Sequence, residues 1–236
     1  MDSLKGILSD LRVFLYTGIQ TLPLTLSGTM LLLGLFTANY AMLFFLAGFL
    51  VFVPLVNHVL NMGLTALLPD APYLKVRTGD VCSLVTPLGG PSPGGESDKH
   101  VMSQWMAMVS FFFGYMFHNS VKLMMREPEP TGSVEVSEKE VKEQSTKTSY
   151  RKTQALVSLL SLIVVSIVIF ILRYRTGCES IVGFIVALLG YGTAGYFWYY
   201  ALSSVGQDRL SDLFGMANRL LAPGAIASGP VVCMPS

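Results

Sequence analysis

The sequence predicts an all-α integral membrane protein, a polytopic bundle of about five transmembrane helices with a short amphipathic helix near the C-terminus. Of its 236 residues, 13% are charged and 52% are hydrophobic, whereas soluble domains carry about 25% charged residues. The stretch from Val13 to Pro69 contains no Asp, Glu, Lys or Arg. As a helix it would be roughly twice the length that crosses a bilayer core of about 30 Å. It must therefore fold back on itself.

The spans are predicted to be helices rather than strands. In hydrocarbon, unpaired backbone groups are so costly that only helices and closed barrels cross a membrane. Barrel strands alternate apolar and polar residues over about ten positions. The run at residues 159–165 (Leu-Leu-Ser-Leu-Ile-Val-Val) does not alternate, so helices are expected.

Residues 1–62 are predicted to form an N-terminal helix and the first transmembrane hairpin. The two spans cover about 17–36 and 40–62, with a tight turn where the stretch is most polar. Apolar residues in the first part recur at helical spacing among a few charged ones. Residues 4–22 therefore form either an extension of the first span or a separate helix that lies on the membrane.

Two polar segments flank the third span. Residues 63–99 form a loop that is rich in Pro and Gly in its second half, which excludes regular helix there. The unit at 100–125 contains the third span, about 101–121, whose Met and Phe content indicates packing more than a soft-metal site. Residues 126–153 form a charged loop that is either disordered or holds a solvated helix near 136–144.

Residues 154–204 contain the fourth and fifth spans, at about 154–172 and 180–203, joined by a short polar hairpin. The tail, residues 205–236, begins with apolar residues from Leu210 to Leu221 that share one helical face. This pattern predicts a short interfacial helix.

The fifth span carries small residues at positions i, i+4, i+7 and i+11, which share one face of a regular helix. They are Gly183, Ala187, Gly190 and Ala194. Small faces let helix backbones approach closely in lipid. Packing within the protomer is the favoured interpretation, and an oligomer interface is the alternative. The aromatic residues that follow predict a belt at the membrane boundary: Tyr196, Trp198, Tyr199 and Tyr200.

Polar residues near the end of the second span, Asn57, His58 and Asn61, are candidates for a transport or proton role. Their position near the predicted boundary, where polar groups cost little, favours an ordinary interfacial role. No predicted span carries a charged residue at its centre, which argues against a proton-coupled transporter or cation pump.

Catalysis, cofactor binding and metal binding are not expected. The three histidines and three cysteines lack ligand spacing, and no protease motif is present. The net charge of +1 does not suggest nucleic acid as a partner. Cys82 and Cys178 fall on the same predicted side of the membrane, so a disulfide between them and two separate thiols are both open.

Three short motifs in the last third of the chain resemble a known group of proteins. They are residues 176–180 (Thr-Gly-Cys-Glu-Ser), residues 212–215 (Asp-Leu-Phe-Gly) and residues 229–235 (Gly-Pro-Val-Val-Cys-Met-Pro). Together they resemble small multi-span membrane proteins of nucleocytoplasmic large DNA viruses, such as the chlorella viruses. The resemblance implies a place in the internal membrane of the virion, beneath the capsid, and in some cases a role as a minor capsid component.

The leading hypothesis is therefore a structural protein that links the internal membrane of a virus particle to its capsid shell. Its partners would be the lipid bilayer and other virion membrane or capsid proteins. One alternative is a small channel or transporter of cellular type, in which Asn57, His58 and Asn61 line a cavity. Another is a membrane-scaffold protein of a cellular organelle.

Overall fold

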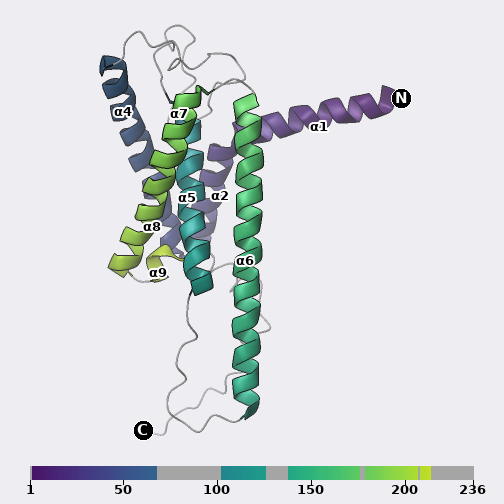
Figure 1. Ribbon diagram of the computed structural model, residues 1–236, viewed down its shortest axis with the longest axis vertical. Helices are drawn as coiled ribbons and strands as arrows, with labels where there is room; N and C mark the ends of the chain where they lie inside the picture. Colours follow the sequence, from purple (N-terminus) through teal and green to yellow (C-terminus); the bar gives the residue numbers. More distant parts are fainter. Residues whose placement is uncertain (1, 68–101, 126–137, 176–178, 207, 214–236) are drawn as a thin grey trace.

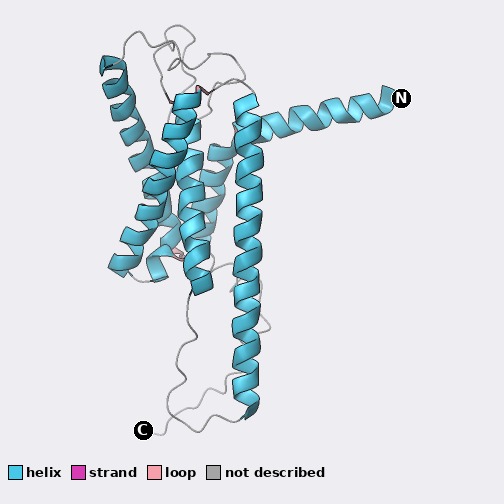
Figure 2. Cartoon of the chain, viewed as in Figure 1, coloured by secondary structure: helices cyan, strands magenta, loops and turns pink. Residues whose placement is uncertain are grey.

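The computed structural model describes residues 2–67, 102–125, 138–175, 179–206 and 208–213, and these residues contain helices but no strand (Figures 1 and 2). The prediction of an all-α protein is thus confirmed for the described chain. Its elements are α1 (Asp2–Gln20), α2 (Leu22–Phe36), α3 (Tyr40–Ala47), the π-helical turn η1 (Gly48–Phe52), α4 (Val53–Leu67), α5 (Gln104–Met125), α6 (Glu138–Arg175), α7 (Ile181–Val186), the π-helical turn η4 (Ala187–Tyr191), α8 (Gly192–Gly206) and α9 (Asp208–Ser211).

The described helices form an up-and-down bundle of five helical segments, each called a pass of the bundle here: α2, α3–η1–α4, α5, α6 and α7–η4–α8 (Figure 1). Helix α5 lies at its centre and packs most extensively against α8 and α6, and also against η4 and α4. Its side chains supply much of the fully buried core, namely Trp105, Met106, Ala107, Met108, Val109, Phe111 and Tyr115. The other passes therefore surround α5 rather than forming a sheet-like row.

Three passes are long and apolar enough to cross a membrane: Tyr40–Leu64, Ala155–Arg175 and Ile181–Val205. A fourth is added if Val13–Gln20 and Leu22–Phe36, which meet at 61°, form one bent span. Helix α5, which the sequence predicts as the third span, is not among them. It is less apolar because its buried position lets it carry polar side chains that meet protein instead of lipid.

The turn between α2 and α3 falls where the sequence predicts it. Ala38 has a positive φ of 50°, in the left-handed region that reverses the chain direction. Asn39 then starts α3, because its side-chain oxygen accepts a hydrogen bond from the Ala41 N–H at 2.9 Å. This local capping explains why so short a connection suffices.

Helix α6 joins two segments that the sequence pattern separates into a charged loop and a span. Its 38 residues run without a break from the predicted loop into the fourth span. At 1.5 Å per residue the helix is about 57 Å long, and it extends past the other passes at the end opposite α1 (Figure 1). The sequence from Glu138 to Arg175 contains no Gly or Pro and many strong helix formers. Nothing in it would end the helix at the membrane boundary.

Helices α5 and α8 cross with their backbones in contact. A Cβ atom on Gly114 would lie 1.9 Å from the Gly192 carbonyl oxygen, and one on Gly195 would lie 2.1 Å from the Phe111 carbonyl oxygen. No side chain fits at either position. Close approach through glycine is a common way for helices to associate in lipid, where the hydrophobic effect does not drive them together.

The face that packs on the fifth pass differs from the predicted one. Gly183 and Ala187 are buried, but Gly190 is exposed and a Cβ added there would meet nothing within 4 Å, and Ala194 is half-buried. Tyr191 and Gly195 are buried instead. The π-helical turn η4 explains the change, because a π turn adds one residue to the helix. The inward face therefore shifts by one position after Ala187.

Helix α9 folds back against α8 and α3 at the end of the bundle where α8 finishes. The Tyr115 hydroxyl donates a hydrogen bond to the Ser211 carbonyl oxygen at 2.9 Å. Leu213 is buried. The predicted interfacial helix from Leu210 to Leu221 lies mostly outside the described residues, and its described part includes the end of this short helix.

Candidate functional site

An ion pair is buried at the end of the bundle where α6 finishes and α7 begins. Arg173 lies in the last turn of α6, and Glu179 lies just before α7. Arg173 Nε is 3.5 Å from Glu179 Oε1, and the two side chains are 4% and 0% exposed. The pair therefore ties together the two arms of the hairpin between the fourth and fifth predicted spans.

Ser103 connects this ion pair to α5. Its hydroxyl oxygen accepts a hydrogen bond from the Met106 N–H at 3.1 Å, which caps the first turn of α5. The same hydroxyl donates to Glu179 Oε1. Burial raises the pKa of the Glu179 carboxyl above its ordinary value, and the contacts with Ser103 and Arg173 oppose that rise. Desolvation of the carboxylate is thus the dominant effect at this position.

Trp105 extends the cluster to the N-terminal helix. The Arg173 guanidinium carbon lies 4.8 Å from the centroid of the Trp105 ring, a cation–π arrangement. At its edge, Trp105 Nε1 donates to the Ile19 carbonyl oxygen at 2.8 Å. We call Ser103, Trp105, Arg173 and Glu179 the Arg173 cluster. It connects the last turn of α1 to α5, α6 and the start of α7.

The three polar residues predicted as a transport candidate do not form one site. Asn57 and Asn61 are buried, whereas His58 is exposed. Asn61 pairs with the backbone of Met102, donating from Nδ2 to the carbonyl oxygen at 3.2 Å and accepting from the N–H at 3.1 Å. Asn57 Oδ1 accepts from the Tyr191 hydroxyl at 3.3 Å. Both asparagines thus join α4 to other parts of the bundle.

The aromatic belt predicted in α8 divides between two faces. Tyr196 and Tyr200 are exposed, whereas Tyr199 is buried. Trp198 is half-buried, and its Nε1 donates to the Phe44 carbonyl oxygen at 3.2 Å. Five aromatic residues occupy the five consecutive positions 196–200, and they cannot all point to lipid. The inward pair, Trp198 and Tyr199, packs between α8 and its neighbours α3 and α5.

A histidine lies against this aromatic segment. The His118 ring stacks on the Tyr196 ring with centroids 3.9 Å apart. His118 Nδ1 lies 3.0 Å from the Tyr196 carbonyl oxygen. Lys122 Nζ is 5.5 Å from the Tyr199 centroid. These contacts join the last turns of α5 to α8 at the end opposite the Arg173 cluster.

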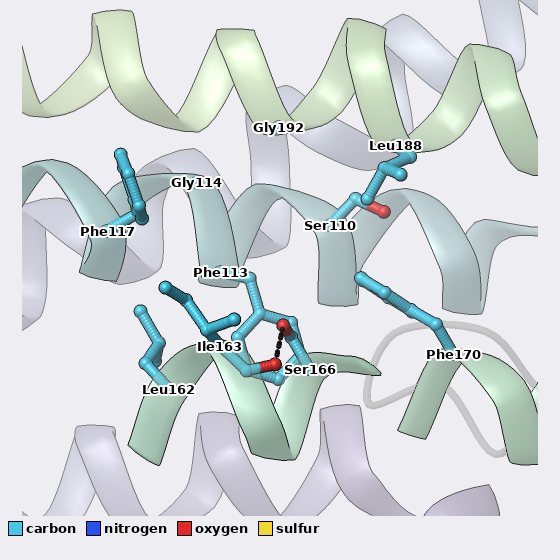
Figure 3. A pocket seen from close by; sticks show the side chains of 10 residues that line it. All are labelled: Ser110, Phe113, Gly114, Phe117, Leu162, Ile163, Ser166, Phe170, Leu188 and Gly192. Carbon is cyan, nitrogen blue, oxygen red and sulfur yellow. Dashed lines mark hydrogen bonds between the residues drawn. The ribbon is translucent and has the colours of Figure 1, made fainter. Parts of the chain in front are cut away.

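A groove lies between α5, α6 and the fifth pass (Figure 3), with a volume of about 180 Å³. Its lining is almost entirely apolar: Ser110, Phe113, Gly114, Phe117, Leu162, Ile163, Ser166, Phe170, Leu188 and Gly192. The Ser166 hydroxyl donates to the Ile163 carbonyl oxygen of its own helix at 2.8 Å. The groove offers no charged or activated nucleophilic group for chemistry on a substrate.

The described residues were compared with two further kinds of site, a metal site and a disulfide. Within it, no group of three or more His, Cys, Asp or Glu side chains is placed to hold a metal ion. The predicted disulfide pair, Cys82 and Cys178, lies outside the described residues. The Arg173 cluster is therefore the main concentration of buried charge that the structure describes.

Comparison with known proteins gives no match, whether against family models, curated proteins or solved structures.

The Arg173 cluster was not predicted from the sequence. From the pattern alone, the charges near the hairpin are expected to mark a solvent-facing turn. A usable signal was present, because opposite charges six positions apart flank a turn between two apolar runs. A carboxylate and a guanidinium held that close to hydrocarbon are expected to pair.

Replacing Arg173 with Met is expected to lower the free energy of unfolding by about 3–5 kcal/mol, because the Glu179 carboxylate then loses its buried partner. The measurement is reversible unfolding of the purified protein in mixed micelles near neutral pH. Arg175→Met is the matched control, since Arg175 is exposed in the same helical turn, and it should change stability by less than about 0.5 kcal/mol. The double variant R173M/E179Q should recover part of the loss. Equal effects of R173M and R175M would contradict a structural role for the pair.

Proposed function

We propose that this chain is a structural integral membrane protein whose five helical passes all cross the bilayer around a packed interior. The observation that carries the proposal is the burial of α5. Phe45, Phe49, Phe111 and Tyr115 fill the space between α3–η1 and α5 and are fully buried. An interior filled in this way supports a packing role more than a path for solute.

The position of α5 supports its crossing. It runs in the opposite sense to α6 and covers about the same depth of the bundle as α7–η4–α8 beside it (Figure 1). The lipid-facing surface belongs to its neighbours, which expose large apolar side chains such as Val59, Leu160, Val164 and Leu189. Because α5 is shielded by those helices, its polar residues do not need to enter lipid.

The placement of polar groups argues against the channel or transporter alternative. Asn57 and Asn61 form hydrogen bonds to other parts of the bundle. The buried ion pair between Arg173 and Glu179 lies at one end of the bundle, not at its centre. A transport site is expected near the midplane of the membrane.

The particular membrane is proposed from the sequence resemblance together with the shape of α6. We place the protein in the internal membrane of a large DNA virus particle, where it would link the bilayer to the capsid shell. The helical turns of α6 before Ala155 extend about 25 Å beyond the span. Such a rigid post would be able to meet other virion membrane or capsid proteins.

This placement predicts that purified particles contain the protein and that detergent stripping of the internal membrane removes or exposes it. The measurement is mass spectrometry of particles before and after stripping, with infected-cell membranes as the comparison. Finding the protein in infected-cell membranes but never in particles would refute the placement and leave the membrane architecture intact.

Five crossings predict that Cys82 and Cys178 share one side of the membrane and that Cys233 lies on the other. Three variants, each retaining one cysteine and carrying Ser at the other two, would be placed in sealed vesicles of one orientation. A membrane-impermeant maleimide would then label either the first two cysteines or the third. If α5 does not cross, Cys82 and Cys233 should instead share a side and Cys178 should lie opposite. That pattern would contradict the proposal.

A further inference from the structure

Helix α1 leaves the bundle at an angle and makes little contact with it. The helix axis bends by 61° between Val13–Gln20 and Leu22–Phe36, and α1 projects sideways from the end that holds the Arg173 cluster (Figure 1). Trp105 fixes the carbonyl oxygen of Ile19, in the last turn of α1. The direction in which α1 leaves is therefore held by a buried contact.

One face of α1 is apolar and uncovered. Ile7, Leu11 and Phe14 stand at i, i+4 and i+7, so they share a face, and they are 63%, 50% and 73% exposed. Asp10, three positions after Ile7 and four before Phe14, lies at the edge of the same face and is also exposed. Three large apolar side chains that share one largely exposed helix face are expected to meet another apolar surface.

The length of α2 indicates that this apolar surface is lipid. Its 15 residues measure about 22 Å, which is short of a bilayer core of about 30 Å. The Val13–Gln20 segment is uncharged and about 12 Å long, and at 61° to α2 it adds about 6 Å along the α2 direction. The hydrocarbon depth that α2 lacks is thus nearly supplied by the slanting last turns of α1.

We propose that α1 is a lipid-binding helix that inserts its apolar face into a single leaflet, at the end of the bundle that holds the Arg173 cluster. The inference rests on the proposed membrane-spanning function. The uncharged stretch that begins at Val13 in α1 continues through the whole of α2. Following α1 from Gln20 toward the N-terminus, the first charged residues are Arg12 and Asp10. They lie where the helix reaches the headgroups.

The chemistry of the partner is that of neutral lipid. Asp2, Lys5, Asp10 and Arg12 contribute two charges of each sign, so the side chains of α1 carry no net charge to attract an anionic surface. The burial of apolar area then supplies the binding. Zwitterionic phosphatidylcholine is sufficient for α1 to insert.

Spin labels report the depth of α1 in the full-length protein. Cys82, Cys178 and Cys233 are first replaced by Ser, and single cysteines are then introduced as Ile7→Cys, Phe14→Cys or Asp10→Cys. Each is labelled with a nitroxide in phosphatidylcholine vesicles, and its depth is measured from its relative accessibility to oxygen and to a water-soluble nickel complex. Val164→Cys, on the lipid-facing side of α6, serves as the reference for a deep position.

The label at position 14 is expected in the outer part of the hydrocarbon, and about 5 Å deeper than the label at position 7. The label at position 10, which lies between them along the helix and at the edge of the same face, is expected at an intermediate depth. Water-like accessibility at positions 7 and 14 with a deep reading at Val164→Cys would overturn the inference alone. An aqueous reading at Val164→Cys would overturn the proposed function as well.

A second copy of the chain would also be able to cover the apolar face of α1. The same spin-label experiment distinguishes such a protein–protein contact from contact with lipid. Labels at a protein–protein contact would be shielded from both oxygen and nickel. They would also show spin–spin broadening that disappears when labelled protein is diluted with unlabelled protein. Either result at positions 7 and 14 would contradict lipid as the partner of α1.

Discussion

The architecture depends on the close contact between the backbones of α5 and α8. The two Cβ positions that would collide most severely, at Gly114 and Gly195, face backbone atoms of the opposite helix and not flexible side chains. No rotamer change could relieve such a collision. This contact holds α5 at the centre, and its central place in turn decides which residues meet lipid and which meet protein.

The polar contacts are arranged around this dry centre. At one end, the Arg173 cluster joins α1, α5, α6 and α7, and Asn61 ties α4 to a residue just before α5. At the other end, Tyr115 anchors α9 and His118 stacks on α8. Between the two ends the contacts are mainly apolar, and the buried hydrogen bond from Tyr191 to Asn57 is an exception. Most of the polar contacts thus lie toward the ends, where polar groups cost less than in the centre of the bundle.

The apolar spans were predictable because lipid imposes a length and a composition. The predicted spans at 40–62, 154–172 and 180–203 lie close to the candidate spans Tyr40–Leu64, Ala155–Arg175 and Ile181–Val205. The centre of the bundle was harder to predict, since a helix buried in protein and a helix facing lipid are both rich in apolar residues. The polar residues of α5, such as Ser110 and Asn119, are the feature that distinguishes it.

Two features of the site were not predicted from the sequence. The π-helical turn η4 changes the inward face after Ala187. A regular helical period predicts that Gly190 faces inward, whereas Tyr191 occupies that inward position in the structure. The Arg173–Glu179 pair depends on how tightly the hairpin brings α6 and α7 together, which periodicity does not report. Both follow from packing against α5, a contact between segments distant in the sequence.

The most direct measurement of this account is the stability of Gly114→Ala in mixed micelles, compared with Gly190→Ala. The two changes add the same methyl group to a helical glycine, but only the first meets the backbone of another helix. Gly114→Ala should lower the free energy of unfolding by about 1–3 kcal/mol or more, while Gly190→Ala should leave it unchanged or slightly raised. Equal effects of the two substitutions would contradict the central position of α5.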